Sequence, residues 1–182
     1  MDRIDNLRSV VGEVYRAHPF EIIAWVVLPE HLHAIWRMPD GDTDYPMRWG
    51  LIKAGFSRAL PKVEKIGQSR TKKGERGIWQ RRYWEHMIRD DLDLERHVDY
   101  IHYNPVKHGC VRRAMDWEFS TFHRYVRAGW IPENWGGETI PDTVGRGELA
   151  NPNMGIENIG PSGFVLGFVP HPNLPGLPLS TE

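Results

Sequence analysis

The sequence predicts one domain of mixed α-helices and β-strands over residues 1–136 and a Gly/Pro-rich, mostly disordered tail over residues 137–182. Apolar residues recur at helical spacing in several stretches, which indicates amphipathic helices. Two adjoining stretches rich in β-branched and aromatic residues are separated by one tight turn, which indicates a pair of strands. After Gly136, the frequent Gly, Pro and Asn residues show no helical period, and this composition is typical of disorder.

The first elements of the domain are a helix, two strands and a second helix. Residues 5–17 keep the i, i+3, i+4, i+7 spacing of one buried helical face. Residues 21–28 and 31–38 are predicted strands joined by a Pro-Glu turn. The second helix is predicted to begin at the N-cap Asp44 and to end at Leu60, before a proline. On that helix, the residues predicted to face the core are Leu51, Phe56 and Leu60, and those predicted to face outward are Arg48, Lys53 and Arg58.

The second half of the domain again contains both predicted helices and a predicted strand. The segment after Pro61 is polar, basic and contains glycine, so we expect a loop there. Acidic residues are favoured at a helix N-terminus, and they stand at the start of the third predicted helix. The apolar stripe of this helix contains Leu94, Val98 and Ile101. The predicted elements are a loop over residues 62–77, a strand over 78–88, a helix that begins at Asp90 or Asp91, a short helix that begins at Asn104-Pro105 after a kink, and a helix over 121–128.

Charge is unevenly distributed along the chain, although the formal net charge is only −1. Between Lys53 and Arg89 there are eleven Lys or Arg residues and three Glu residues, an excess of eight positive charges. From Glu133 to Glu182, five Glu and one Asp oppose a single Arg, an excess of five negative charges. A basic middle and an acidic tail favour a polyanionic partner, although a solvated basic face gives the same pattern.

Composition disfavours secreted and membrane proteins. The single cysteine, Cys110, excludes an internal disulfide and a cysteine-rich zinc site, and it fits a reducing cytosol. No apolar run approaches the roughly 20 residues that span a bilayer, and the amphipathic N-terminus is unlike a signal peptide. We therefore expect a cytoplasmic protein with no membrane partner, and the sequence leaves open whether it is a monomer or a homodimer.

The second predicted strand carries a pair of histidines that can bind one metal ion. Side chains alternate along a strand, so His31 and His33 share one face, whereas Leu32, Ala34 and Trp36 lie on the other, toward a core. Two residues rise roughly 6.6 Å along a strand, which lets both imidazoles converge on one ion. Imidazole suits Mn, Fe, Zn or Cu, and it tolerates Mg when phosphate oxygens and water complete the shell. Two half-exposed strand histidines without a metal fit the same pattern.

The third predicted helix carries a second group of polar residues. His97, Tyr100 and Asn104 are spaced i, i+3 and i+7, so they share a face beside the core stripe. In a functional interpretation, Tyr100 is a nucleophile and the Asn104 amide oxygen is a metal ligand. Tyrosine has a usual pKa of about 10, so it needs a metal that polarises the phosphate it attacks. A polar helix flank, with Asn104 as an N-cap, explains the same residues without a function.

These two groups of residues resemble motifs of known enzymes. His31-Leu32-His33 resembles the His-hydrophobic-His motif of single-tyrosine HUH endonucleases. Residues 100–109 (YIHYNPVKHG) resemble the catalytic-tyrosine helix of the REP-associated tyrosine transposases, a bacterial branch of these enzymes. The resemblance covers residues 5–137. Further segments that agree with this family are residues 24–29 (AWVVLP), 79–84 (WQRRYW), 116–117 (DW) and 120–125 (STFHRY).

The resemblance implies a ferredoxin-like α+β sandwich with an antiparallel sheet and helices on one face. It implies a transposase that nicks and joins single-stranded DNA near hairpin-forming repeats through a 5′-phosphotyrosine. Tyr100 matches the nucleophile, while His31, His33 and Asn104 match the ligands of a divalent metal, Mg²⁺ or Mn²⁺. Tyr103, on a different helical face, is the competing candidate for the nucleophile.

Two features depart from the family pattern. The family order βαββαβ places a first strand near the middle of the sheet, before the helix at residues 5–17. This chain starts at that helix, so we expect the first strand to be missing. Residues 163–169 (GFVLGFV) are the only part of the tail with strand character and are an alternative source of that strand. The resemblance gives the tail after Gly137 no role.

Single-stranded or hairpin DNA is the expected partner. The aromatic residues Trp79, Tyr83 and Trp84 are candidates to stack on unpaired bases, although Trp79 fits a core position better. The alternative function is a non-catalytic, domesticated or truncated hairpin-binding protein. A zinc deaminase or hydrolase is disfavoured, because the chain lacks the Cys ligands and the His-x-Glu arrangement. The candidates for contacts with DNA phosphates are Lys53, Arg58, Lys72, Lys73, Arg81 and Arg82.

Overall fold

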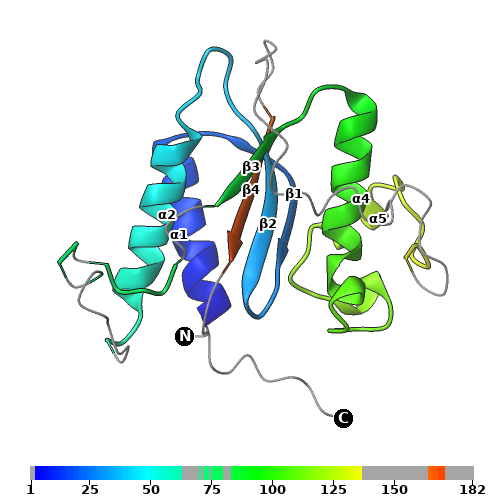
Figure 1. Cartoon of the computed structure of the whole chain (residues 1–182). Helices are drawn as coiled ribbons and strands as arrows, with labels where there is room; N and C mark the ends of the chain where they lie inside the picture. The colour runs from blue at the N-terminus through cyan, green and yellow to red at the C-terminus, as the bar shows by residue number, and fades with distance from the viewer. Residues whose placement is uncertain are drawn as a thin grey trace.

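A computed structural model of the chain describes residues 3–62, 70, 72–73, 75–79 and 83–136, together with the backbone of residues 164–170 (Figure 1). The helices and strands follow the order that the sequence predicts, with one strand added near the C-terminal end. Their bounds are α1 Arg3–Ala17, β1 Glu21–Val27, β2 His31–Arg37, α2 Tyr45–Ala59, β3 Trp84–Met87, α4 Asp91–Lys107, the 3₁₀ turn η1 Ala114–Asp116, α5 Phe122–Arg127 and β4 Phe164–Pro170.

The four strands form one antiparallel sheet in the order β1-β2-β4-β3. β1 and β2 are the predicted hairpin, in which Val27 pairs with Leu32 next to the turn. β4 lies between β2 and β3, so that Phe168 pairs with His33 on one side and with Trp84 on the other. The strand that carries the histidine pair is therefore an inner strand of the sheet.

β4 fills the position of the central strand that is expected to be missing, and it comes from the tail segment, residues 163–169, that is the predicted alternative source of that strand. It pairs along the whole of β2, from His31 opposite Pro170 to Arg37 opposite Phe164. Without it, β2 and β3 would each leave a row of backbone groups unpaired in the middle of the sheet, which is costly. The valines and aromatic residues of this segment also favour an extended strand. The other residues after 136 lie outside the described part, so the boundary between domain and tail stays a prediction.

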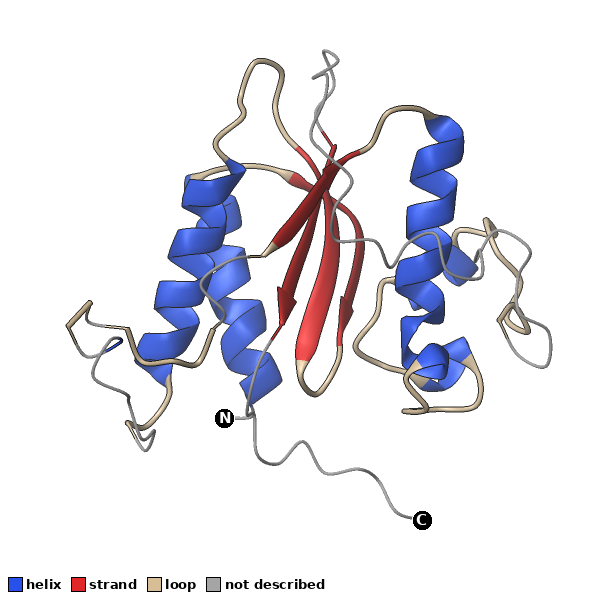
Figure 2. Cartoon of the chain, in the orientation of Figure 1, coloured by secondary structure: helices blue, strands red, loops and turns tan. Residues whose placement is uncertain are grey.

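Helices cover both faces of the sheet, which corrects the expected arrangement with helices on one face (Figure 2). α1 and α2 pack on one face, and α4 packs on the other with α5 beside it. The alternation along β2 divides its side chains between the two layers. Leu32, Ala34 and Trp36 pack with α1 and α2, as predicted, whereas Ile35 packs with α4. Each face of the sheet therefore has its own apolar core.

α2 begins at the predicted cap, where the Asp44 carboxylate accepts a hydrogen bond from the Met47 N–H. The face that it turns to the core differs from the predicted one, because Leu51 is 39% exposed. The expected outward position of Arg48 is also wrong. Its guanidinium is buried because it pairs with Asp42 and donates to two backbone carbonyls of the loop before β1. The buried residues of α2 are Arg48, Trp49, Ile52 and Phe56.

The third strand is shorter than the predicted strand over residues 78–88. Ile78 and Trp79 pack with the apolar core between the sheet and α2 instead of continuing β3. The Trp79 indole N–H donates to the Lys53 carbonyl and to the Ser57 hydroxyl, at 3.0 Å in both cases. These contacts hold the partly buried Trp79 against the core, in agreement with the prediction that it fits a core position better than a stacking platform.

The predicted helix break at Asn104-Pro105 is wrong, because α4 continues through Pro105 to Lys107. Proline inside a helix removes one N–H donor and crowds the preceding turn. Here Ile101, Asn104 and Pro105 are all buried, so packing holds the last turn in helical form. The consequence is that residues 100–107 share one continuous helical register.

The outer edge of β1 is covered by the segment before α5. The Val27 N–H donates to the Phe119 carbonyl, and the Thr121 N–H donates to the Trp25 carbonyl. These hydrogen bonds prevent another strand from pairing with that edge of the sheet. Within the part of the chain that the structure describes, no helix combines the length and the hydrophobicity needed to cross a membrane.

Candidate active site

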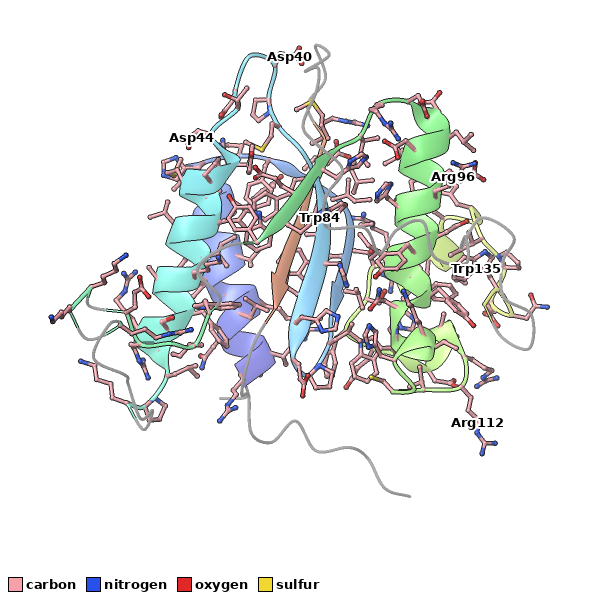
Figure 3. The ribbon with its side chains drawn as sticks, in the orientation of Figure 1. Asp40, Asp44, Trp84, Arg96, Arg112 and Trp135 are labelled. Atoms are coloured by element: carbon pink, nitrogen blue, oxygen red, sulfur yellow. The ribbon has the colours of Figure 1, made fainter. Side chains whose placement is uncertain are left out.

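The predicted histidines and tyrosine meet between β2 and α4. His31 and His33 lie on β2 with their ring centroids 5.0 Å apart. The Tyr100 ring of α4 packs edge-on against the His33 imidazole, at a centroid distance of 5.4 Å. Side chains from the sheet, among them Trp84 of β3, and from α4 fill the space between these two elements, whereas Arg96 lies on the outer side of α4 (Figure 3).

Asn104 lies one helical turn after Tyr100 and is completely buried. The amide acts as a hydrogen-bond partner of His31 and His33, but within the described residues neither of its polar atoms has a hydrogen bond of normal geometry. A buried polar group left in this state costs about 1–3 kcal/mol. A cation bound at the amide oxygen would offset that cost. The interpretation of Asn104 as an N-cap is wrong, since it lies inside α4.

Burial keeps both strand histidines neutral. It lowers the pKa of His31 to about 4, and the nearby His108 acts in the same direction. Burial also lowers the pKa of His33 well below its usual value, with further lowering from the charges of its neighbours, whereas Asn104 opposes the shift. A neutral imidazole keeps the lone pair that a metal ion needs. His33 is only 3% exposed, so the alternative of two half-exposed histidines is wrong for this residue.

The donor atoms of this group suit a divalent cation that works on phosphate. Two imidazole nitrogens and one amide oxygen leave coordination positions for phosphate oxygens and water, as Mg²⁺ and Mn²⁺ require. The buried amide of Asn104, beside the neutral imidazoles of His31 and His33, therefore fits the metal that the resemblance implies.

Two further residues at the end of α4 belong to this group and were missed by the sequence analysis. The Lys107 ammonium lies 4.6 Å from the centroid of the Tyr100 ring. The His108 ring centroid lies 4.9 Å from that of His31. The predicted break before Pro105 concealed both, because a continuous helix places Lys107 two turns after Tyr100 on the same face.

Tyr103, the competing candidate nucleophile, packs elsewhere. Its ring contacts Trp135 at a centroid distance of 6.4 Å, and a Cβ at Gly136 would meet it at 3.2 Å. Among the described aromatic contacts, Tyr103 touches neither His31 nor His33. The geometry therefore favours Tyr100.

Comparisons with known proteins agree with the residues gathered here. No protein-family model matches the chain. A REP-associated tyrosine transposase of Escherichia coli is 48% identical over 139 residues, which are 76% of this chain and 76% of that protein. The chain belongs to the REP-associated tyrosine transposases.

Two further comparisons support the membership. A Haemophilus influenzae protein that bears the same name provisionally is 46% identical over 149 residues, 81% of this chain and 84% of its own. A solved structure of the REP-associated tyrosine transposase bound to a REP hairpin matches with a TM-score of 0.63 and 47% identity. That match covers 75% of this chain and 74% of the other. The chain is thus an HUH tyrosine enzyme, as its motifs indicated.

This transposase has a second group of metal-ligand side chains, between β3 and α4. Ligand atoms of His86, Asp93 and His97 all lie within 4.8 Å of one another, a His₂-carboxylate composition that many metals accept. His86 Nε2 is 2.8 Å from Asp93 Oδ2, which also accepts the Arg89 N–H, so the carboxylate joins β3 to the first turns of α4. Of the partners of His97, which the sequence analysis did not find, Asp93 lies four residues earlier on α4, at a spacing that places both side chains on one helical face. His86 lies on β3, and no sequence spacing reveals a contact between β3 and α4.

Among the described residues, two of the predicted DNA-binding residues of this transposase lie on the other side of the sheet from Tyr100. Lys53 and Arg58 lie on α2, which covers the face of the sheet opposite α4. Burial lowers the pKa of Lys53, and its ammonium lies 4.7 Å from the centroid of the Tyr83 ring. Their contacts with DNA stay predictions. Of the other candidates, Lys72 and Lys73 are exposed, and Arg81 and Arg82 lie outside the described residues.

Proposed function

We propose that this transposase nicks and rejoins single-stranded DNA beside hairpin-forming repeats, with Tyr100 as the nucleophile and a 5′-phosphotyrosine as the intermediate. The observation that carries the proposal is the edge-on contact between Tyr100 and His33, next to the buried amide of Asn104. The solved relative bound to a REP hairpin supports hairpin DNA as the partner of this chain as well.

In the proposed reaction, the Tyr100 oxygen forms a bond to phosphorus while the bond from phosphorus to the 3′ oxygen breaks. The tyrosine proton passes to solvent and the 3′ oxygen takes up a proton, which leaves a free 3′ hydroxyl. Attack by a 3′ hydroxyl on the phosphotyrosine later rejoins the strand and frees the tyrosine. His31, His33 and Asn104 would hold Mg²⁺ or Mn²⁺, which supplies Lewis-acid polarisation of phosphate oxygens when bound.

β4 weakens the case for a non-catalytic hairpin-binding protein. That alternative depended on a sheet without its central strand, and β4 occupies the position between β2 and β3. A covalent adduct with a single-stranded oligonucleotide separates the two functions, because only the enzyme forms one.

The metal role of His33 is tested by replacing it. We expect His33→Ala to slow nicking of a hairpin oligonucleotide at least about 100-fold in Mn²⁺ and to weaken Mn²⁺ binding, because one ligand is lost. His123→Ala is the matched control. The His123 imidazole of α5 is hydrogen-bonded to the carbonyl of Trp117, which lies in the segment before α5. Nicking is measured by gel electrophoresis and bound Mn²⁺ by electron paramagnetic resonance. Equal nicking in EDTA and in Mn²⁺ would contradict the proposed metal.

The basic segment is tested through the salt dependence of hairpin binding. We expect the double variant Lys72→Ala/Lys73→Ala to flatten the log–log slope by about one to two units if both lysines contact phosphate. Sequence preference should change little, because phosphate contacts do not read bases. The control is Arg8→Ala/Arg16→Ala on α1, which removes the same charge from exposed residues. Equal slopes for the two double variants would place the DNA away from Lys72 and Lys73.

A further inference from the structure

Lys107 occupies a fixed position at the C-terminal end of α4. The helix closes through hydrogen bonds from the Gly109 N–H to the Val106 carbonyl and from the Cys110 N–H to the Pro105 carbonyl, at 2.9 Å each. Gly109 adopts a φ of 68°, the left-handed conformation that glycine allows at such a helix end. This closure keeps Lys107 in the last helical turn, where its ammonium stands 4.6 Å from the centroid of the Tyr100 ring.

The charge of Lys107 is not neutralised by the part of the protein that the structure describes. No carboxylate among those residues forms an ion pair with it, and Glu30, which acts on the adjacent His108, does not approach it as an ion-pair partner. An exposed cation over the proposed nucleophile, with no counter-ion among the described residues, is suited to bind an anion.

We infer that Lys107 is a catalytic residue whose ammonium donates a hydrogen bond to a non-bridging oxygen of the scissile phosphate. This inference rests on the proposed role of Tyr100 as the nucleophile. Negative charge builds up on the phosphoryl oxygens as the bond from the Tyr100 oxygen to phosphorus forms and the bond to the 3′ oxygen breaks. Lys107 keeps its proton throughout, so it stabilises this charge in nicking and again in rejoining.

The test compares Lys107→Met, which removes the charge, with Lys107→Arg, which keeps it. The control is Arg96→Met, which removes a positive charge from another exposed residue of α4 (Figure 3). We expect Lys107→Met to slow single-turnover nicking and rejoining about 100-fold, with hairpin affinity and its salt slope nearly unchanged. Lys107→Arg should retain at least about a tenth of the rate, and Arg96→Met should match the parent protein.

A substrate with a methylphosphonate at the scissile position separates catalysis from structure. The methyl group replaces one charged phosphate oxygen, so the charge of Lys107 has less to neutralise there. The defect of Lys107→Met relative to the parent should then shrink from about 100-fold to within about fivefold. The same defect on both substrates would overturn the inference in favour of a structural role. A flatter salt slope with an unchanged rate would overturn it in favour of a DNA contact outside the reaction.

The outcome also distinguishes this inference from the proposed function. If the parent protein forms no covalent adduct with the unmodified oligonucleotide, the proposed function fails. If the parent forms the adduct and Lys107→Met forms it equally fast, only the role of Lys107 fails.

Discussion

Tyr100→Phe is expected to abolish the covalent adduct with a single-stranded oligonucleotide, with a loss of nicking rate of at least about 1,000-fold. The substitution removes only the hydroxyl that would form the bond to phosphorus. The ring that packs against His33 stays, so we expect the fold and hairpin affinity to be retained. The measurement is single-turnover nicking in Mn²⁺ together with hairpin binding by fluorescence anisotropy.

Tyr103→Phe is the matched control for this experiment. Tyr103 lies three residues later on the same helix but packs against Trp135. The Tyr103→Phe variant should therefore nick DNA at nearly the rate of the parent protein. Loss of the adduct in Tyr103→Phe, with the adduct retained in Tyr100→Phe, would reverse the assignment of the nucleophile.

The second large effect is expected from breaking β4. Leu166 pairs with Ile35 of β2 on one side and with His86 of β3 on the other. Proline at this position removes a ladder N–H from a strand with a neighbour on both edges, and proline is not tolerated inside such strands. We expect Leu166→Pro to lower the free energy of unfolding by about 3 kcal/mol or more. Nicking should fall as well, because His31 and His33 lie on the neighbouring strand.

Leu179→Pro is the control, because it makes the same substitution beyond the end of β4 at Pro170. Urea unfolding followed by tryptophan fluorescence gives both free energies. Equal unfolding midpoints for Leu166→Pro and Leu179→Pro would show that β4 does not hold the sheet together.

Local patterns in the sequence predicted the parts of the site that depend on local geometry. The alternation along β2 placed His31 and His33 on one face, and Leu32 and Trp36 pack in the opposite core as expected. Helical spacing placed Tyr100 and Asn104 on one face of α4 in the same way. These predictions succeed because the direction of a side chain follows from the period of its own strand or helix.

The features that the sequence analysis missed depend on contacts between distant segments. Strand character makes residues 163–169 a candidate for the central strand, but it does not decide between that candidate and a missing strand, because it does not say which partners a strand will find. Pro105 is a helix breaker by local rules, but burial of Ile101 and Asn104 keeps α4 intact around it. Arg48 is buried because Asp42 pairs with its charge and two carbonyls of the distant loop before β1 accept its hydrogen bonds.

The most direct test of the central claim is to locate the DNA on the protein. The full chain is incubated with a hairpin oligonucleotide and Mn²⁺, digested with trypsin, and analysed by tandem mass spectrometry. Cleavage after Arg96 and Lys107 releases residues 97–107, a peptide that contains both Tyr100 and Tyr103. We predict that Tyr100 carries the added mass of the cleaved DNA fragment, joined to it through the 5′ phosphate. A mass on Tyr103, or no adduct on this peptide while nicking proceeds, would contradict it.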